Sequence, residues 1–169
     1  MGAWGKIWPF RPSRAQADAD RLLAAVTQIS RQPSFYGDGR IPDTLEGRFE
    51  LMTLHAALAL IRLRAEAGAE PLAQDFTDKL FRQFDAGLRE AGVGDLSVPK
   101  RMRKLSGEFY GRLDAYAAPL GAGDQTALQN ALARNMGTEP FAPALAAYAF
   151  AAKARQAAEA LENLMRFDG

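Results

Sequence analysis

Residues 33–64, PSFYGDGRIPDTLEGRFELMTLHAALALIRLR, join a loop rich in glycine and proline to the most apolar helical segment of the chain. Asp43 or Thr44 can cap this helix, because each side chain has an oxygen that accepts a hydrogen bond from a first-turn N–H. Apolar residues recur with the 3.6-residue period in two adjacent stripes, namely Leu45, Phe49, Met52, Ala56, Leu60 and Leu63, and beside them Leu51, Leu54, Leu58 and Ile61. A helix that is apolar around so much of its circumference must be surrounded by other helices. The pattern therefore predicts a central apolar helix over about residues 44–67.

Three polar residues interrupt this surface at intervals of seven: Arg48, His55 and Arg62. Residues seven apart lie on nearly the same side of a helix. The strip is therefore either a face in contact with water, with arginine stems over the neighbouring helices, or a basic docking strip for an anionic partner segment. No carboxylate is placed to orient His55 as a catalytic base. A role for His55 as a haem ligand is a further alternative, which a haem titration would test.

The composition is typical of one compact helical protein. The 169 residues are enough for a single domain with a buried core. Lys and Arg number 21 against 20 Asp and Glu, so the overall charge does not favour nucleic acid as a partner. The chain has no Cys, which excludes disulfides, thiolate metal sites and cysteine nucleophiles.

Helical patterns recur along the whole chain, and no strand pattern interrupts them. Besides the central helix, we expect helices over about residues 14–31, 72–91, 99–118, 125–136 and 144–166. Ser13 and Asp124 are candidate caps, and we expect Pro119 to end the fourth helix. The sequence predicts an all-α fold, a single compact domain of about six helices around the central one, over residues 14–169.

Residues 1–13 are predicted to form a separate basic and aromatic arm. They lack an apolar run of signal-peptide length before Pro9 and Pro12. The arm interleaves aromatic and apolar residues with cations: Trp4, Ile7, Trp8 and Phe10 with Lys6, Arg11 and Arg14. This mixture suits a membrane–water interface, but an arm packed on its own domain, or a disordered tail, is an open alternative. No segment reaches the ~18 apolar residues of a membrane helix, so we expect a cytoplasmic protein, with peripheral contact at the inner membrane as an open alternative.

No motif supplies a catalytic set. Asp75, Asp78 and Asp85 lie on the polar side of the third helix, but a chain with one His cannot provide the repeated Glu-x-x-His pairs of a di-iron bundle. Ser97 and Lys100 match a Ser-x-x-Lys pattern without its companion motifs, and we expect Ser97 to cap the fourth helix instead. The sequence thus indicates no enzyme, no metal site and no cofactor.

The start of the fourth helix carries four cations, Lys100, Arg101, Arg103 and Lys104. Cations there oppose the helix dipole, where a typical terminal charge is worth about 0.3–1 kcal/mol. Either Asp95 or Glu108 neutralises them on a solvated face, or they meet an anionic partner such as phosphate, acidic lipid headgroups, RNA or an acidic protein. Aromatic residues are not interleaved with them, so RNA contact would be with the backbone and non-specific, and we expect no specific DNA binding.

Three runs resemble the ubiquinol–cytochrome c chaperone family of respiratory complex III assembly factors, in the form expected of an alphaproteobacterial member. They are residues 33–64, quoted above, residues 81–112, FRQFDAGLREAGVGDLSVPKRMRKLSGEFYGR, and residues 127–136, ALQNALARNM. The resemblance implies an all-helical, non-enzymatic chaperone whose client is newly made cytochrome b, held for haem insertion and complex assembly. Mitochondrial relatives work with a small partner protein near the ribosomal tunnel exit, so a second assembly factor or the ribosome is a further expected partner.

We expect the partner-binding residues to lie within the first two of these runs: Phe35, Tyr36, Asp43, Arg48, Phe49, His55, Arg62, Asp95, Lys100, Arg101, Arg103, Lys104, Tyr110 and Arg112. Two other functions remain as alternatives. A ribosome- or RNA-associated helical protein predicts salt-dependent RNA affinity that depends on the four cations. A helical hydrolase or transferase predicts a deep polar pocket with converging acids.

Overall fold

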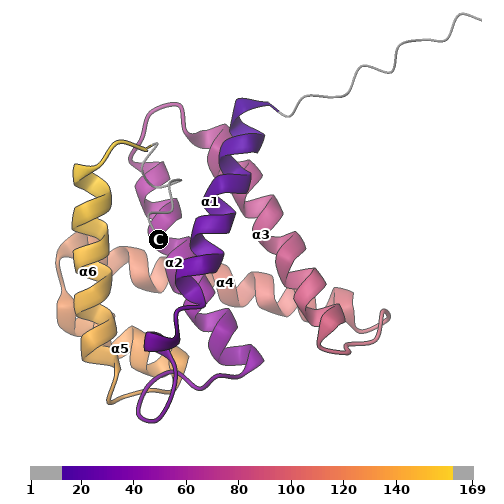
Figure 1. Cartoon of the computed structure of the whole chain (residues 1–169). Coiled ribbons are helices and arrows are strands. Elements are labelled where there is room, and N and C mark those ends of the chain that lie inside the picture. Colours follow the sequence, from indigo (N-terminus) through magenta and orange to yellow (C-terminus); the bar gives the residue numbers. More distant parts are fainter. Residues whose placement is uncertain (1–12, 162–169) are drawn as a thin grey trace, which may run out of the picture.

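The computed structural model describes residues 13–161, and within them the chain is all-α (Figure 1). The elements in order are α1 (Arg14–Ser30), the short 3₁₀ helix η1 (Pro33–Phe35), α2 (Leu45–Arg64), α3 (Glu70–Glu90), α4 (Val98–Ala122), α5 (Gln125–Met136) and α6 (Ala142–Ala158). The predicted fold, a single compact all-α domain of about six helices, is confirmed. Of the predicted arm, only Ser13 lies within the described residues, where it caps α1.

Helix α2 lies at the centre of this arrangement. It packs against each of the other five α-helices, which surround it in Figure 1. Every residue from 50 to 60 is buried, so three turns of α2 are covered on all sides. Thr44 supplies the cap, since its Oγ1 accepts a hydrogen bond from the N–H of Gly47 at 3.1 Å. The central apolar helix predicted from the sequence is therefore confirmed.

Aromatic rings join the inner faces of α2, α3 and α4. Phe84 of α3 lies between Phe49 of α2 and Phe109 of α4, with ring centroids 5.1 Å and 6.4 Å away. Phe81 meets Phe109 edge to face at 5.4 Å. Edge-to-face pairs add to the stabilisation that burial alone provides. This cluster fixes the spacing of the three helices whose ends form the candidate site below.

The loop between α1 and α2 folds back over the first turn of α2. Ile41 and Phe35 are both buried in the core, and the hydroxyl of Tyr36 donates to the carbonyl of Ser30 at 2.6 Å. The loop approaches so closely that a Cβ atom on Gly47 would lie 2.0 Å from the carbonyl oxygen of Pro42. Phe35, which the sequence suggested as a partner-binding residue, is therefore part of the core and does not reach the surface.

His55 is buried among α1, α2 and α6. Its Nδ1 lies 2.9 Å from the carbonyl oxygen of Leu51 and 3.0 Å from Oγ of Ser30, and its Nε2 lies 2.8 Å from the hydroxyl of Tyr148. A carbonyl only accepts, so Nδ1 carries the proton and Nε2 accepts from Tyr148. Burial lowers the pKa of His55 to about 4, and the bond to Leu51 opposes this only in part. His55 is thus a neutral tie between helices.

The polar strip of α2 is not a continuous surface. Arg48 is exposed, whereas His55 is buried and Arg62 donates from Nε to the carbonyl of Gln156 at 2.9 Å. Both partners on this side, Tyr148 and Gln156, belong to α6. Neither a face in contact with water nor a basic docking strip therefore describes the strip as a whole, because α6 covers its middle and its end and only Arg48 is exposed.

Two helix ends also differ from the prediction. Helix α4 passes through Pro119 and ends at Ala122. A proline removes only one backbone hydrogen bond, and the carbonyl of Leu120 accepts from Nζ of Lys153 at 2.6 Å. Gly123 then ends the helix with a positive φ of 73°. Ser97 makes no side-chain capping bond at the start of α4. Helix α6 is described to Ala158, and residues 162–166 of the predicted last helix lie outside the described residues.

The close approach of the loop to α2 predicts an unusual effect of a Gly→Ala substitution. Replacing a glycine inside a helix with alanine normally stabilises a protein by about 0.5–1 kcal/mol. Gly47→Ala should instead destabilise by about 1–3 kcal/mol, because the new methyl group meets Pro42. Gly107→Ala in α4 is the matched control, since nothing lies within 4 Å of its added Cβ. Urea unfolding of both variants tests this, and equal stabilisation by both would contradict the loop's position.

The burial of His55 predicts a pH dependence with a defined sign. The pKa of histidine is 6.5 in an unfolded chain and about 4 for His55 in the folded protein. Between these two values the unfolded chain binds a proton that the folded protein does not bind. Stability should therefore fall as the pH drops through this window, by about 3 kcal/mol in total. His55 is the chain's single histidine, so one imidazole NMR signal reports it. A signal that titrates between about pH 6 and 7 would contradict the burial, and His55→Gln should lose this part of the pH dependence.

Candidate functional site

A groove of about 810 Å³ opens where the ends of four helices meet. The last turn of α1, the first turns of α2, the end of α3 and the first half of α4 line it. Its apolar lining residues come from three of these helices: Leu45, Phe49 and Met52 of α2, Phe84 and Leu88 of α3, and Leu105 of α4. Leu45 is 44% exposed. The groove thus presents apolar surface that no residue between 13 and 161 covers.

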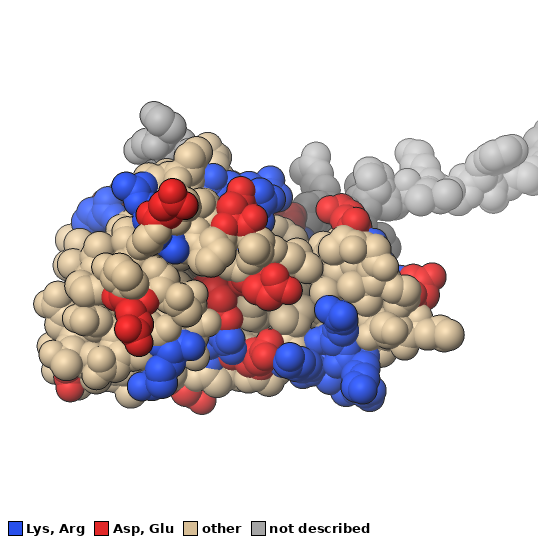
Figure 2. Space-filling model, turned by 90° about the horizontal axis from the view of Figure 1, so that it is seen from below, with Lys and Arg blue, Asp and Glu red and all other residues tan. Residues whose placement is uncertain are grey.

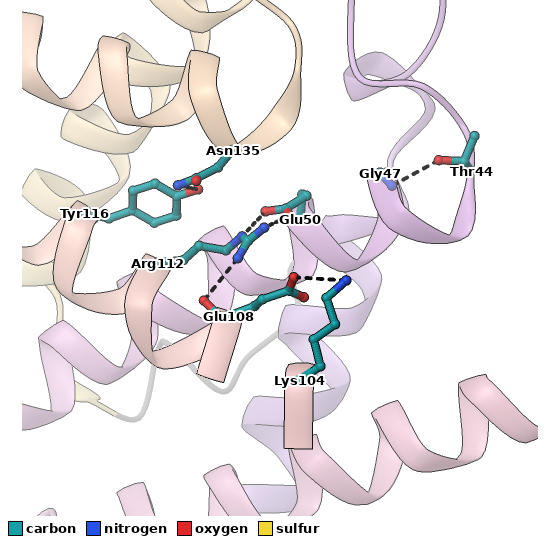
Figure 3. A network of polar contacts seen from close by, with 8 residues as sticks. All are labelled: Thr44, Gly47, Glu50, Lys104, Glu108, Arg112, Tyr116 and Asn135. Carbon is teal, nitrogen blue, oxygen red and sulfur yellow. Dashed lines mark hydrogen bonds and ion pairs between the residues drawn. The ribbon is translucent and has the colours of Figure 1, made fainter. Parts of the chain in front are cut away.

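An ion pair between α2 and α4 forms part of the groove wall (Figure 3). Arg112 donates with Nε to Oε2 of Glu50 at 2.5 Å and with Nη2 to Oε1, while its Nη1 donates to the carbonyl of Glu108 at 3.2 Å. The guanidinium lies 5.7 Å from the ring centroid of Phe49. Burial raises the pKa of Glu50, although its hydrogen bonds with Arg112 oppose the rise.

This pair holds the groove in shape. Separating a buried pair leaves an uncompensated charge and costs about 3–5 kcal/mol. Both oxygens of Glu50 are already bonded to Arg112, so neither group is available to act as an acid or a base. Glu50 and Arg112 therefore link α2 to α4 and place a paired charge beside the apolar residues of the wall.

Charged side chains of both signs surround the apolar part of the groove. Arg48 donates to Asp43 at 2.7 Å, which lowers the pKa of that carboxyl. Nζ of Lys104 lies 3.7 Å from Oε1 of Glu108 (Figure 3). Arg31, Glu46, Glu90 and Arg101 complete the rim. The face drawn in Figure 2 likewise carries both signs, with Lys and Arg gathered most densely at one end.

The structure brings together some of the predicted partner-binding residues and separates others. The groove is lined by six of them, Tyr36, Arg48, Phe49, Arg101, Lys104 and Arg112, and Asp43 joins them through its ion pair with Arg48. Phe35, His55 and Arg62 are held inside the domain. Tyr110 is 45% exposed and does not line the groove; its ring packs against Phe81.

The interpretation of the start of α4 as a solvated face requires Asp95 or Glu108 to neutralise its four cations, and only Lys104 has such a partner. Asp95 pairs with Arg89 at 2.5 Å and not with any of them, and Glu108 is the partner of Lys104. Lys100, Arg101 and Arg103 are exposed and form no ion pair among residues 13–161. Three positive charges at this end of α4 are therefore available to an external partner.

Sequence reasoning missed Glu50, although a signal for it exists. Glu50 stands between Phe49 and Leu51 in the most apolar stretch of the chain. An acid in a helix that is buried all around needs a cation from another helix. The partner could not be identified from spacing, because Arg112 is 62 residues away. Met52, Phe84 and Leu105 were assigned only to the core, since periodicity does not show where a core opens.

The groove contains no activated nucleophile or free acid pair. Ser30 lies beside His55, but Nδ1 of His55 already carries the proton that it donates to Leu51 and cannot accept the serine's proton. Over the described part of the chain, no three His, Asp or Glu side chains gather as a metal site. Nor does any helix there have the length and apolar character needed to cross a membrane.

Known proteins match this chain in both sequence and fold. The family model described as ubiquinol-cytochrome C chaperone matches residues 38–166. The crystal structure of the Cbp3 homolog from Brucella abortus is similar with a TM-score of 0.79 and 39% sequence identity, over 89% of this chain and 86% of that one.

A partial likeness to an enzyme also exists. A glutaminase from Aeromonas hydrophila subsp. hydrophila is 30% identical over 87 residues, which are 50% of this chain. The chain spans only 28% of the length of that glutaminase. The family model and the Brucella structure, in contrast, each cover most of the chain. The protein therefore belongs to the ubiquinol-cytochrome C chaperone family.

Proposed function

We propose that this protein is a non-enzymatic chaperone for assembly of the ubiquinol–cytochrome c reductase, respiratory complex III, and that its client is newly made cytochrome b. The groove between the ends of α1, α2, α3 and α4 carries the proposal. Among the described residues it is an open apolar surface with a charged rim, in a chain that belongs to the ubiquinol-cytochrome C chaperone family.

The chemistry of the groove suits a helix of a membrane protein before its insertion is complete. An amphipathic or apolar helix binds by laying its apolar side into a hydrophobic groove. Leu45, Phe49 and Leu105 offer such a surface, and the buried side chains of Met52 and Phe84 line it more deeply. The rim carries both signs, so polar residues that flank a client helix find partners on either side. The Glu50–Arg112 pair links α2 to α4 at the wall of the groove.

Binding alone is sufficient for this role. Two of the four acids that line the groove are paired, Glu50 with Arg112 and Glu108 with Lys104, while Glu46 and Glu90 lie at the rim. His55 is buried and neutral. This supports a chaperone that shields its client without changing it chemically. A second assembly factor or the ribosome remains part of the proposal as an additional partner.

Leu45→Glu is the variant that tests the groove. Leu45 is the first residue of α2, where an acid is favoured by the helix dipole, so the domain should stay folded. The new charge would be desolvated against an apolar client, which should weaken capture of cytochrome b at least tenfold. The measurement is quantitative affinity capture with tagged protein from a respiring host, read as the yield of cytochrome b.

Tyr110→Glu is the matched control. Tyr110 is as exposed as Leu45, at 45% against 44%, but lies outside the groove, so its variant should capture cytochrome b as the wild type does. If Tyr110→Glu lost capture and Leu45→Glu did not, the client would bind on another face of α4 and not in the groove. Enrichment of ribosomal RNA in place of cytochrome b by the wild type would overturn the proposed client and favour an RNA-associated function.

A further inference from the structure

We infer that the loop before α4 and the first turns of α4 form a docking surface for anionic lipid headgroups. We call it the 96–104 surface, and it consists of Leu96, Lys100, Arg101, Arg103 and Lys104. This inference goes beyond the proposed function and does not depend on the identity of the client. It rests on an exposed apolar side chain, on three cations without ion-pair partners among residues 13–161, and on the hydrogen-bonded turn and helix that hold them.

The apolar part of the surface is Leu96. Its side chain is 99% exposed, the most of any large apolar residue in the described chain. Single exposed leucines are common, but this one is held on an anchored turn. The N–H groups of Ser97 and Val98 donate to the carbonyl of Gly94 at 2.8 Å and 3.2 Å, and Val98 is buried. Leu96 is therefore projected from a fixed position next to the cations.

The cations form one continuous arc. At 100° per residue, positions 100, 101, 103 and 104 span about 160° of the circumference of α4. No acid lies in the first turn of α4, and Lys104 alone has an acidic partner, Glu108, among the described residues. The nearest loop acid, Asp95, is occupied by Arg89. The arc therefore presents an excess of positive charge beside an apolar tip.

This combination favours a lipid surface over RNA. Phosphates attract Lys and Arg in both cases, but an RNA backbone offers nothing to an exposed leucine, and Leu96 has no aromatic neighbour on the turn on which bases could stack. A bilayer accepts both groups at once, because its headgroup layer holds the charges and its acyl boundary holds the apolar side chain.

The position of the surface relates it to the groove. Arg101 and Lys104 belong to both, since they also line the groove. A protein bound to a membrane through the 96–104 surface would therefore hold one rim of its groove beside the bilayer. An apolar helix could then pass between bilayer and groove over a short distance.

Vesicle sedimentation of the full chain tests the inference. The wild type should bind vesicles of phosphatidylglycerol mixed with phosphatidylcholine at low salt, and should not bind vesicles of phosphatidylcholine alone. The variant Lys100→Gln/Arg101→Gln/Arg103→Gln/Lys104→Gln should bind at least a hundredfold more weakly, since each cation near an anionic surface contributes about fivefold. Leu96→Ser should weaken binding about tenfold with no loss of fold, because the side chain it removes makes no internal contact.

A second quadruple variant controls for total charge. Arg64→Gln/Arg82→Gln/Arg134→Gln/Arg155→Gln removes the same charge from exposed positions on α2, α3, α5 and α6, and its vesicle binding should stay within about twofold of the wild type. Unchanged vesicle binding in both the Leu96 and the 100–104 variants would overturn the inference. So would an equal loss in the two quadruple variants, which would show a response to net charge only.

Two further measurements distinguish lipid binding from RNA binding and from the capture of cytochrome b. Single-stranded RNA retention by the same variants tests the RNA alternative: a loss confined to RNA, with vesicle binding intact, would overturn the lipid assignment. Capture of cytochrome b in detergent should be unchanged in Leu96→Ser, because Leu96 lies outside the groove. If the wild type captured cytochrome b but did not bind vesicles, only the lipid inference would be overturned. If it bound vesicles but did not capture cytochrome b, only the proposed client would be overturned.

Discussion

Every polar group in the middle of α2 must find a partner inside the protein, because other helices cover three turns of α2 on all sides. Glu50 is bonded to Arg112 of α4, and His55 to Ser30 of α1 and Tyr148 of α6. Each partner comes from a different helix, so these bonds fix the positions of α1, α4 and α6 around the centre. Thr53 is the exception, since its buried Oγ1 has no partner among the described residues.

The groove follows from where this complete coverage ends. Before residue 50, α2 leaves the centre of the domain, and α1, α3 and α4 border it without closing over it. Phe49 therefore contacts the core on one side and the groove on the other. The same helix thus supplies the stability of the fold and an uncovered apolar surface. The Glu50–Arg112 pair lies at this boundary and joins α2 to α4 there.

The sequence predicts best what depends on periodicity. The all-round apolar pattern of α2 was sufficient to place it at the centre, and the caps Ser13 and Asp124 were found because capping is local. The path of the loop over Gly47 has no periodic signal, so the burial of Phe35 was missed. The spacing of His55 and Arg62 places them on one side of α2, but it does not show that α6 covers that side. The groove was predicted only as scattered residues, because it is formed by helix ends whose meeting depends on tertiary packing.

The walls of the groove come from distant parts of the chain. Thr27 and Ser30 on one side are synthesised long before Leu105 and Arg112 on the other, and the ion pair that joins α2 to α4 spans 62 residues. A partly synthesised chain that ends before α4 has α1 and α2 but neither Arg112 nor the opposite wall. The groove therefore cannot exist on a nascent chain of that length, and the uncovered side of α2 is then itself a surface prone to aggregation. During its own synthesis this protein therefore exposes apolar surface of α2 until α4 has been made.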